Sequence, residues 1–314
     1  MTIGCGGSLV AAMSRKTEID LFGATALTGF AILLAFNQVA IKVTNGGIQP
    51  VFFAALRSFG ALFCLLLWLR WRGVSLHFPK ETLLPGVVTG VFFALEFFFL
   101  FIALDYTTVA RSGIIFYSMP VWLALAGHFF LADDRLTPAK LIGLIVALCG
   151  VAWALFGRDP ETGGSIWGDL AALIAAFGWA GLTLVTKGSA LNKVRPELQL
   201  LVQLAVSGPL LLLLSFFMGD LIRDLGPIHL AGLAFQIIVV VAAGYVFWLW
   251  LLSIYPASSV ASFSFLSPVF SVIMGWGLLG EALSRDILFA LVLVAIGIFL
   301  VNRPRKKIYV PQNV

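Results

Sequence analysis

The sequence predicts an all-α membrane protein with ten transmembrane helices, arranged as two inverted repeats of five helices each. Three observations support this prediction: an apolar composition, regularly spaced apolar segments, and a match between the two halves of the chain. Hydrophobic residues make up 61% of the 314 residues and charged residues only 11%, whereas a soluble domain carries roughly 25% charged residues. Mean hydropathy is +1.03, so most side chains have no water-facing surface to cover.

Each apolar segment is long enough to cross a bilayer, which takes ~20 mostly apolar residues. Proline marks several of the starts: Pro50, Pro138 and Pro196 stand at or next to the first residue of a segment, where the missing N–H is harmless. The expected spans are residues 20–43, 49–70, 82–104, 108–131, 138–157, 166–187, 197–218, 230–254, 257–280 and 286–302.

Loop charges predict the orientation of these spans. Lys and Arg concentrate in the loops on the side of both termini, for example at Arg70, Arg72, Lys193 and Arg195. Because cytoplasmic loops carry the excess of Lys and Arg, we expect a multi-pass protein of the bacterial inner membrane with both termini in the cytoplasm. The basic residues lie in short loops rather than on one soluble face, which argues against nucleic acid as a partner.

The two halves of the chain match at a nearly constant offset. Gly23 and Lys42 in the first half correspond to Gly168 and Lys187 in the second. Because each repeat holds an odd number of spans, the second repeat enters the membrane upside down. Inverted repeats are typical of alternating-access transporters, whose binding site lies near the midplane between the repeats. The resulting domains are a tail (1–19), a first repeat (20–157), a second repeat (166–302) and a basic tail (303–314).

Pro120 and Pro268 are candidates for the interruption of two spans. They lie near the middle of the corresponding segments 108–131 and 257–280. A proline removes one helix hydrogen bond and kinks the chain, and matched interruptions in two repeats point to the binding site of a transporter. The alternative is an ordinary membrane-helix kink whose freed backbone groups bond to neighbouring hydroxyls.

Polar side chains inside the spans supply further candidates for a substrate cavity or a gate. Ser264 and Ser267 belong to a small and polar stripe at helical spacing, which either lines a cavity or allows close helix packing. A buried amide needs a hydrogen-bond partner, so we expect one of Asn37 and Gln38 to point inward. The full set of candidates is Asn37, Gln38, Glu96, Ser118, Pro120, Tyr245, Ser264, Ser267 and Pro268.

Arg57 and Glu96 are the charged residues that lie deep inside spans. An Arg or Asp at the bilayer centre costs ~2.5–3.5 kcal/mol on insertion scales. Both residues lie roughly 10–13 Å below the predicted outer surface at 1.5 Å per residue. We therefore expect a direct ion pair that acts as a structural lock. The alternative is that Glu96 binds a proton or another cation; the second repeat has Gln203 and Tyr245 at the matching positions.

Several segments carry a family pattern: AFNQVAIK in the first span, AALRSFGAL in the second, ALDYTTVA and MPVWLAL in the third and fourth, and SVASFSFLSPVFSVIMGWGLLGEALS in the second half. Together they resemble the EamA-type repeats of the drug/metabolite transporter superfamily. Asp133 and Asp134 depart from the Gly-Glu that this family usually has there. The resemblance implies a carrier driven by protons or another gradient. Its substrate would be an amino acid or a related small metabolite, often exported, and spans 1, 3, 4, 6, 8 and 9 would surround the cavity.

Two other classes remain as alternatives, a membrane-embedded enzyme and a non-transporting scaffold or sensor. An enzyme needs a nucleophile–base pair or metal ligands. The three histidines, His77, His128 and His229, belong to no such motif, and the cysteines form no metal-binding pattern. We therefore predict no catalytic residue, no metal and no cofactor. A scaffold would not need paired prolines or a glutamate inside a span.

Overall fold

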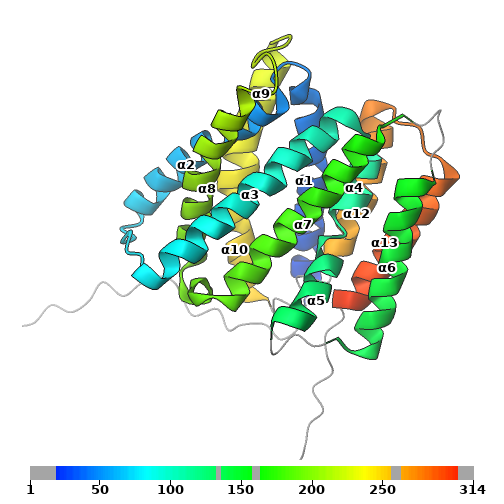
Figure 1. Cartoon of the computed structure of the whole chain (residues 1–314), viewed down its shortest axis with the longest axis horizontal. Helices are drawn as coiled ribbons and strands as arrows, with labels where there is room; N and C mark the ends of the chain where they lie inside the picture. The colour runs from blue at the N-terminus through cyan, green and yellow to red at the C-terminus, as the bar shows by residue number, and fades with distance from the viewer. Residues whose placement is uncertain (1–18, 132–135, 158–162, 256–262, 303–314) are drawn as a thin grey trace, which may run out of the picture.

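A computed structural model describes residues 19–131, 136–157, 163–255 and 263–302. The regular elements in these ranges are helices, joined by short connections (Figure 1). They are α1 (Leu21–Asn45), α2 (Pro50–Trp71), α3 (Lys80–Tyr106), α4 (Val109–Phe116), α5 (Met119–Phe130), α6 (Pro138–Phe156), α7 (Ile166–Gly188), the 3₁₀ turn η2 (Ala190–Lys193), α8 (Pro196–Ser215), α9 (Pro227–Phe235), the π-helical segment η3 (Gln236–Ala243), α10 (Gly244–Ile254), the 3₁₀ turn η4 (Phe263–Phe265), α12 (Leu266–Leu279) and α13 (Arg285–Asn302).

The predicted ten-span architecture is confirmed. Within the described ranges, nine helical segments are long and apolar enough to cross a membrane, and the shorter apolar segment Phe263–Leu279 falls in the predicted ninth span. The fourth span consists of α4 and α5, and the eighth consists of α9, η3 and α10. Observed and predicted boundaries agree within a few residues, because hydropathy and proline placement mark the helix starts.

The helices begin where the sequence supplies caps. Pro50 occupies the first position of α2, and the Gln49 side chain accepts a hydrogen bond from the amide of Phe52 at 2.6 Å. Thr137 caps α6 in the same way, directly before Pro138. A side-chain oxygen at this position satisfies an N–H that the helix itself leaves unpaired.

Small residues set the packing of α6 against α13, the fifth and tenth spans. A Cβ atom added to Gly150 would lie 2.8 Å from Val294, and one added to Gly297 would lie 2.5 Å from Ala147. Glycine therefore lets the two backbones approach closely, as is common between membrane helices. This pair stands at one edge of the bundle (Figure 1).

Matched glycine contacts at the two ends of the bundle reflect the inverted repeat. Gly23 of α1 packs on the ring of Tyr255, and its counterpart Gly168 of α7 packs on Thr107. An added Cβ would meet Tyr255 at 2.5 Å and Thr107 at 2.8 Å. One of these glycine contacts lies at the start of α1, and the other lies at the start of α7, where α3 ends.

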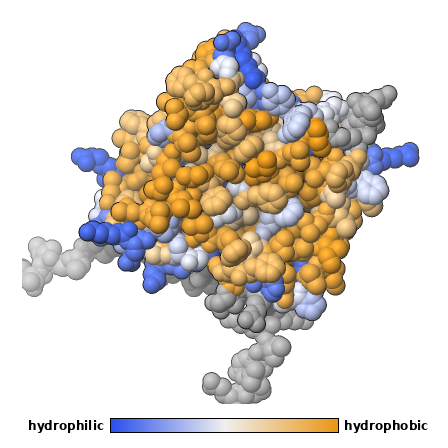
Figure 2. Space-filling model, in the orientation of Figure 1, coloured by the Kyte–Doolittle hydropathy of each residue, from blue (hydrophilic) through white to orange (hydrophobic). Residues whose placement is uncertain are grey.

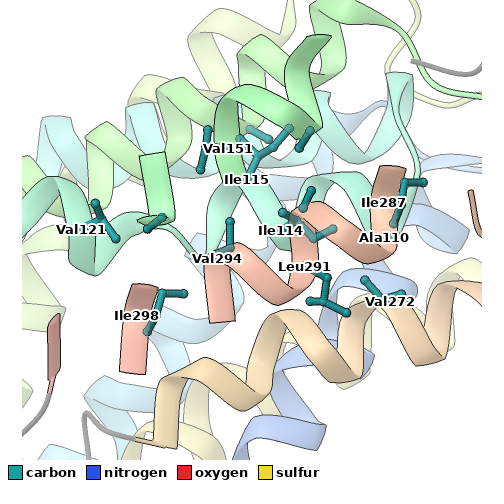
Figure 3. Close-up of a cluster of buried hydrophobic side chains, with 14 of the residues drawn as sticks. Ala110, Ile114, Ile115, Val121, Val151, Val272, Ile287, Leu291, Val294 and Ile298 are labelled. Carbon is teal, nitrogen blue, oxygen red and sulfur yellow. The ribbon is translucent and has the colours of Figure 1, made fainter. Parts of the chain in front are cut away.

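The core joins both repeats. Side chains of α4, α5, α6, α12 and α13, including Ile114, Val121, Val151, Val272 and Val294, form one buried apolar cluster (Figure 3). The visible outer surface is also apolar across its middle, with polar residues toward its edges (Figure 2). An apolar exterior of this kind suits the hydrocarbon core of a bilayer. In that environment a helix satisfies the hydrogen bonds of its own backbone N–H and C=O groups.

Candidate functional site

The two ends of the bundle are named here by the orientation predicted from the loop charges. The predicted outer end carries the connections 46–49, 107–108, 216–226 and 280–284. The predicted inner end is the one where α1 begins and α13 ends.

The fourth span is broken into two helices at Pro120. α4 ends at Phe116, α5 begins at Met119, and Pro120 is the second residue of α5. Ser118 lies in the break and is fully buried. Its hydroxyl donates to the carbonyl of Ile115 at 2.6 Å and accepts from Trp122 Nε1 at 2.9 Å. The candidate Ser118 therefore stabilises the break itself.

The ninth span changes helix type just before Pro268. The 3₁₀ turn η4 is followed by α12, and Pro268 lies buried in the first turn of α12, next to Ser267. Pro268, like Pro120, thus lies in the first turn of the second helical piece of its span. Residues 256–262, the first part of the predicted span, lie outside the described ranges. Ser264 in η4 accepts a hydrogen bond from Asn302 at 3.1 Å.

Gln38 lies at the centre of a buried polar cluster contributed by α1, α4 and α12. Its side chain is fully buried and lies close to the Tyr117 hydroxyl at the break of the fourth span, but neither its Oε1 nor its Nε2 makes a hydrogen bond of good geometry in the described part of the chain. The Oγ of buried Ser271 is also unpartnered. Both side chains approach Gly113 of α4, where an added Cβ would lie 2.9 Å from Ser271 Oγ and 3.5 Å from Gln38 Oε1.

This cluster carries an energetic cost in the observed arrangement. A buried polar group without a partner costs about 1–3 kcal/mol. A solute with hydrogen-bonding groups, or water, would remove that cost by bonding to Gln38 and Ser271. Chemically, the cluster offers one amide and one hydroxyl, which can both donate and accept hydrogen bonds.

Asn37, the neighbour of Gln38, connects α1 to the eighth span. Its Oδ1 accepts a hydrogen bond of 2.5 Å from Nε2 of Gln236, the first residue of η3. Gln236 is fully buried, and its Oε1 has no partner among the described residues. Both Asn37 and Gln38 are therefore buried against protein. Gln236 was not among the residues predicted from the sequence, although a lone amide in an otherwise apolar run is a usable signal. π-helical segments are frequent at functional sites.

The expected ion pair between Arg57 and Glu96 is not formed. Both side chains are buried, but the Arg57 guanidinium stacks on Phe97, 3.9 Å from the ring centroid. The backbone of Glu96 instead faces Gly178 of α7. Successive residues on a helix point about 100° apart, so Phe97 takes the side of α3 that faces α2. Arg57 and Glu96 still interact electrostatically over a longer distance.

Tyr245 lies in the predicted inner half and lines a cavity. Its hydroxyl donates to the carbonyl of Pro196 at 2.5 Å, which joins α10 to the start of α8. The cavity lies between α2, α8 and the eighth span, and its wall includes Ala61, Cys64, Trp68, Leu200, Val241 and Tyr245. These residues come from spans 2, 7 and 8, and not from the spans that carry Pro120 and Pro268. Among the described residues, no cluster of three or more His, Cys, Asp and Glu could hold a metal ion.

A buried ion pair, which the sequence analysis did not anticipate, lies at the predicted outer end. Arg111 at the start of α4 binds Asp169 in the first turn of α7, with Nη2–Oδ2 at 2.7 Å and Nε–Oδ2 at 3.0 Å. Arg111 also donates to the carbonyl of Ala154 at the end of α6, and the Thr107 hydroxyl donates to Asp169 at 2.6 Å. This network joins both repeats.

Two further contacts at the predicted outer end hold the connection between α3 and α4. Glu281, which follows α12, accepts hydrogen bonds from the amides of Val109 and Ala110 at 2.7 and 3.0 Å. It therefore caps α4 in the other repeat. Lys42 donates to the carbonyls of Leu104 and Thr107 at the end of α3. Asp134, the counterpart of Glu281, lies outside the described ranges.

Arg223 closes the same end from the connection between α8 and α9. It makes two hydrogen bonds to Asp105, at 2.8 and 2.9 Å, and a third to the carbonyl of Asn45. The hydrogen bonds to Asp105 raise the pKa of the Arg223 guanidinium above its usual value. The pair is partly exposed, so its contribution to stability is modest.

The sequence was compared with known proteins. Residues 21–156 and 166–303 each match the profile of the EamA-like transporter family. A Salmonella typhimurium protein named as a probable amino-acid metabolite efflux pump is 27% identical over 87% of this chain and 93% of its own. An Escherichia coli protein named as an uncharacterized inner membrane transporter is 26% identical over 95% of this chain and 97% of its own. A crystal structure with 24% identity and a TM-score of 0.63 covers 88% of this chain and 96% of that one, and shares its fold.

Proposed function

We propose, since this chain belongs to the EamA-like transporter family, that it is a secondary transporter that exports an amino acid or a related small metabolite by alternating access. The observation that carries the proposal is the buried, unpartnered side chain of Gln38 beside Ser271. These residues come from different repeats, and a transporter built from inverted repeats binds its substrate between them.

The broken spans support the same location. Gly113, which approaches both Gln38 and Ser271, lies one turn before the break between α4 and α5. Ser271 lies one turn after Pro268 in α12. Interrupted helices in corresponding positions of two repeats are the feature that marks transporter binding sites.

The two ends of the bundle differ in a way that fits one state of an alternating-access cycle. At the predicted outer end, Arg111, Glu281 and Lys42 tie the α3–α4 connection to both repeats. At the predicted inner half, a small cavity of about 50 Å³ lies between α2, α8 and the eighth span, next to the Tyr245–Pro196 hydrogen bond. Transport would require the outer contacts to break and the inner cavity to close.

The direction and setting follow from loop charge and from the relatives. The excess of Lys and Arg in one set of loops supports an orientation with both termini in the cytoplasm of a bacterial cell, and the Escherichia coli relative is named as an inner membrane transporter. The Salmonella relative is named as an efflux pump for amino-acid metabolites, which supports export of a similar substrate. Protons are the proposed coupling ion, with Glu96 as the candidate carrier because it is buried and not engaged in a direct ion pair.

Metabolite profiling tests this function. A strain that overexpresses the protein should accumulate an amino acid or a related metabolite in the medium, and a deletion strain should retain it. Gln38→Leu should abolish the difference without lowering the amount of protein in the membrane. The control is Gln199→Leu. Gln199 lies in the first turn of α8, and its side-chain amide already donates to the backbone carbonyls of Leu191 and Val194. Identical profiles in all strains would favour a scaffold or sensor, and a new compound formed from a consumed one would favour an enzyme.

A further inference from the structure

We propose that Arg57 binds a carboxylate group of the transported solute, so that the substrates of this protein are metabolites with a free carboxylate. The inference rests on the proposed transport function and narrows its substrate class. It starts from a contrast between two arginines that are buried to a similar degree, Arg57 at 5% exposure and Arg111 at 2%.

Arg111 has acceptors for its Nε and Nη2, whereas Arg57 has none for its Nε and Nη1 among the described residues. The Arg111 guanidinium is satisfied by the Asp169 carboxylate and by the carbonyl of Ala154. In Arg57, Nε and Nη1 are buried and have no hydrogen-bond acceptor in the described part of the chain. An arginine inside a span is retained only with a partner or a water-filled cavity. In this proposal the transported solute supplies the acceptor for Nε and Nη1.

Two aromatic rings pack against the Arg57 guanidinium. Its central carbon lies 3.9 Å from the Phe97 ring centroid and 5.8 Å from that of Phe101. A ring offers no hydrogen-bond acceptor in its plane, so Nε and Nη1 keep their N–H groups unpartnered among the described residues. Nε and Nη1 lie on different edges of the guanidinium, and each can donate a charged hydrogen bond to a carboxylate, alone or together with Nη2. A carboxylate fits this arrangement in both shape and charge.

The helix that carries Arg57 packs against the eighth span. Gly60, one helical turn further along α2, packs directly on Ile237 of η3. The neighbour of Ile237 is Gln236, whose Oε1 is unpartnered among the described residues and whose Nε2 bonds to Asn37. The Arg57 guanidinium and the free amide oxygen of Gln236 thus belong to two elements that pack together. An amino acid would present a carboxylate to the former and an ammonium donor to the latter.

The Glu96 carboxylate affects how strongly Arg57 can bind a carboxylate of the solute. Its charge interacts with Arg57 electrostatically, but no direct ion pair occupies the guanidinium. A bound carboxylate and the Glu96 carboxylate therefore compete for the same positive charge. Removing the charge of Glu96 should strengthen the binding of a carboxylate at Arg57.

The test uses the purified full-length protein and a panel of standard L-amino acids, each paired with its α-carboxamide. Ligand binding is measured as a shift of the thermal unfolding temperature, since a ligand that binds only the folded state raises it. One or more acids should stabilise the wild-type protein, and their amides should not. Arg57→Lys should weaken binding of the acid about tenfold or more, because the charged hydrogen bonds of the guanidinium are lost. Glu96→Gln should tighten it.

Arg72→Lys is the matched control, because Arg72 also lies near an aromatic ring, that of Trp68, but is exposed at the predicted inner end. It should bind like the wild type. Equal binding of acids and amides, no binding of any acid, or unchanged binding in Arg57→Lys would overturn the assignment. Export of compounds without a carboxylate would overturn it while leaving transport intact. Acids that bind through Arg57 without any change in the exported metabolites would support the site and reject the transport function.

Discussion

Replacing Arg111 with methionine should destabilise the fold far more than the same replacement at Arg57. Removing Arg111 leaves the fully buried Asp169 carboxylate without the guanidinium that contacts it at 2.7 Å. Breaking a buried pair in this way costs ~3–5 kcal/mol. Arg57 has no direct anionic partner, so methionine there removes only the contact with Phe97, worth ~0.5–2 kcal/mol. It also removes the cost of burying a charge, and the net change should be close to zero.

Denaturant-induced unfolding in detergent micelles, followed by tryptophan fluorescence, measures these differences. The double variant Arg111→Met with Asp169→Asn should regain part of the stability lost by Arg111→Met, because no lone buried charge remains. Thr107 can still donate to the asparagine carbonyl, which preserves one hydrogen bond of the network. The reasoning is wrong if Arg111→Met and Arg57→Met cost the same, or if the double variant loses the sum of the two single losses.

Three further outcomes are expected. Gly168→Ala should destabilise the protein by about 1–3 kcal/mol, because its Cβ would meet Thr107 at 2.8 Å, while Gly29→Ala, with nothing within 4 Å, should be neutral in thermal unfolding. Glu281→Gln should cost about 0.5–2 kcal/mol through a weaker cap on α4, seen in the same assay. Reporter enzymes fused at Asn192 and Asp220 should report opposite sides of the membrane, with Asn192 in the cytoplasm; a shared side would reject the topology.

The spans and their order could be predicted because they depend on local quantities. Hydropathy over a window and the placement of Pro50 or Pro138 do not depend on which helix is a neighbour. The break at Pro120 was likewise visible, since proline acts on its own helix. The type of interruption before Pro268 was not, because it depends on how Phe263–Phe265 packs as a 3₁₀ turn.

Side-chain partners were harder to predict because they depend on helix rotation. Arg57 and Glu96 lie at matched depths, yet depth does not fix which face of α3 meets α2, and Phe97 takes that place. The partner of Arg111 is separated from it by 58 residues and belongs to the other repeat. Gln38 is buried, as expected for an amide inside an apolar span. A polar group in such a span usually faces protein or a cavity, whichever helix lies next to it, so this prediction did not depend on helix rotation.

The ion pair between Arg111 and Asp169 makes the predicted outer end of the bundle different from the inner end. Gly23 and Gly168 are counterparts and make equivalent contacts at opposite ends, so the glycine packing does not favour either end. The residue after each glycine differs: Asp169 follows Gly168, but Ala24 follows Gly23. At the inner end the acidic group beside α1 is Asp20, which caps the helix and accepts a hydrogen bond from the Tyr255 hydroxyl at 2.6 Å. In the proposed alternating-access cycle, the predicted outer end has to open. Opening that end separates a buried ion pair and thus requires a contribution from substrate binding or an ion gradient.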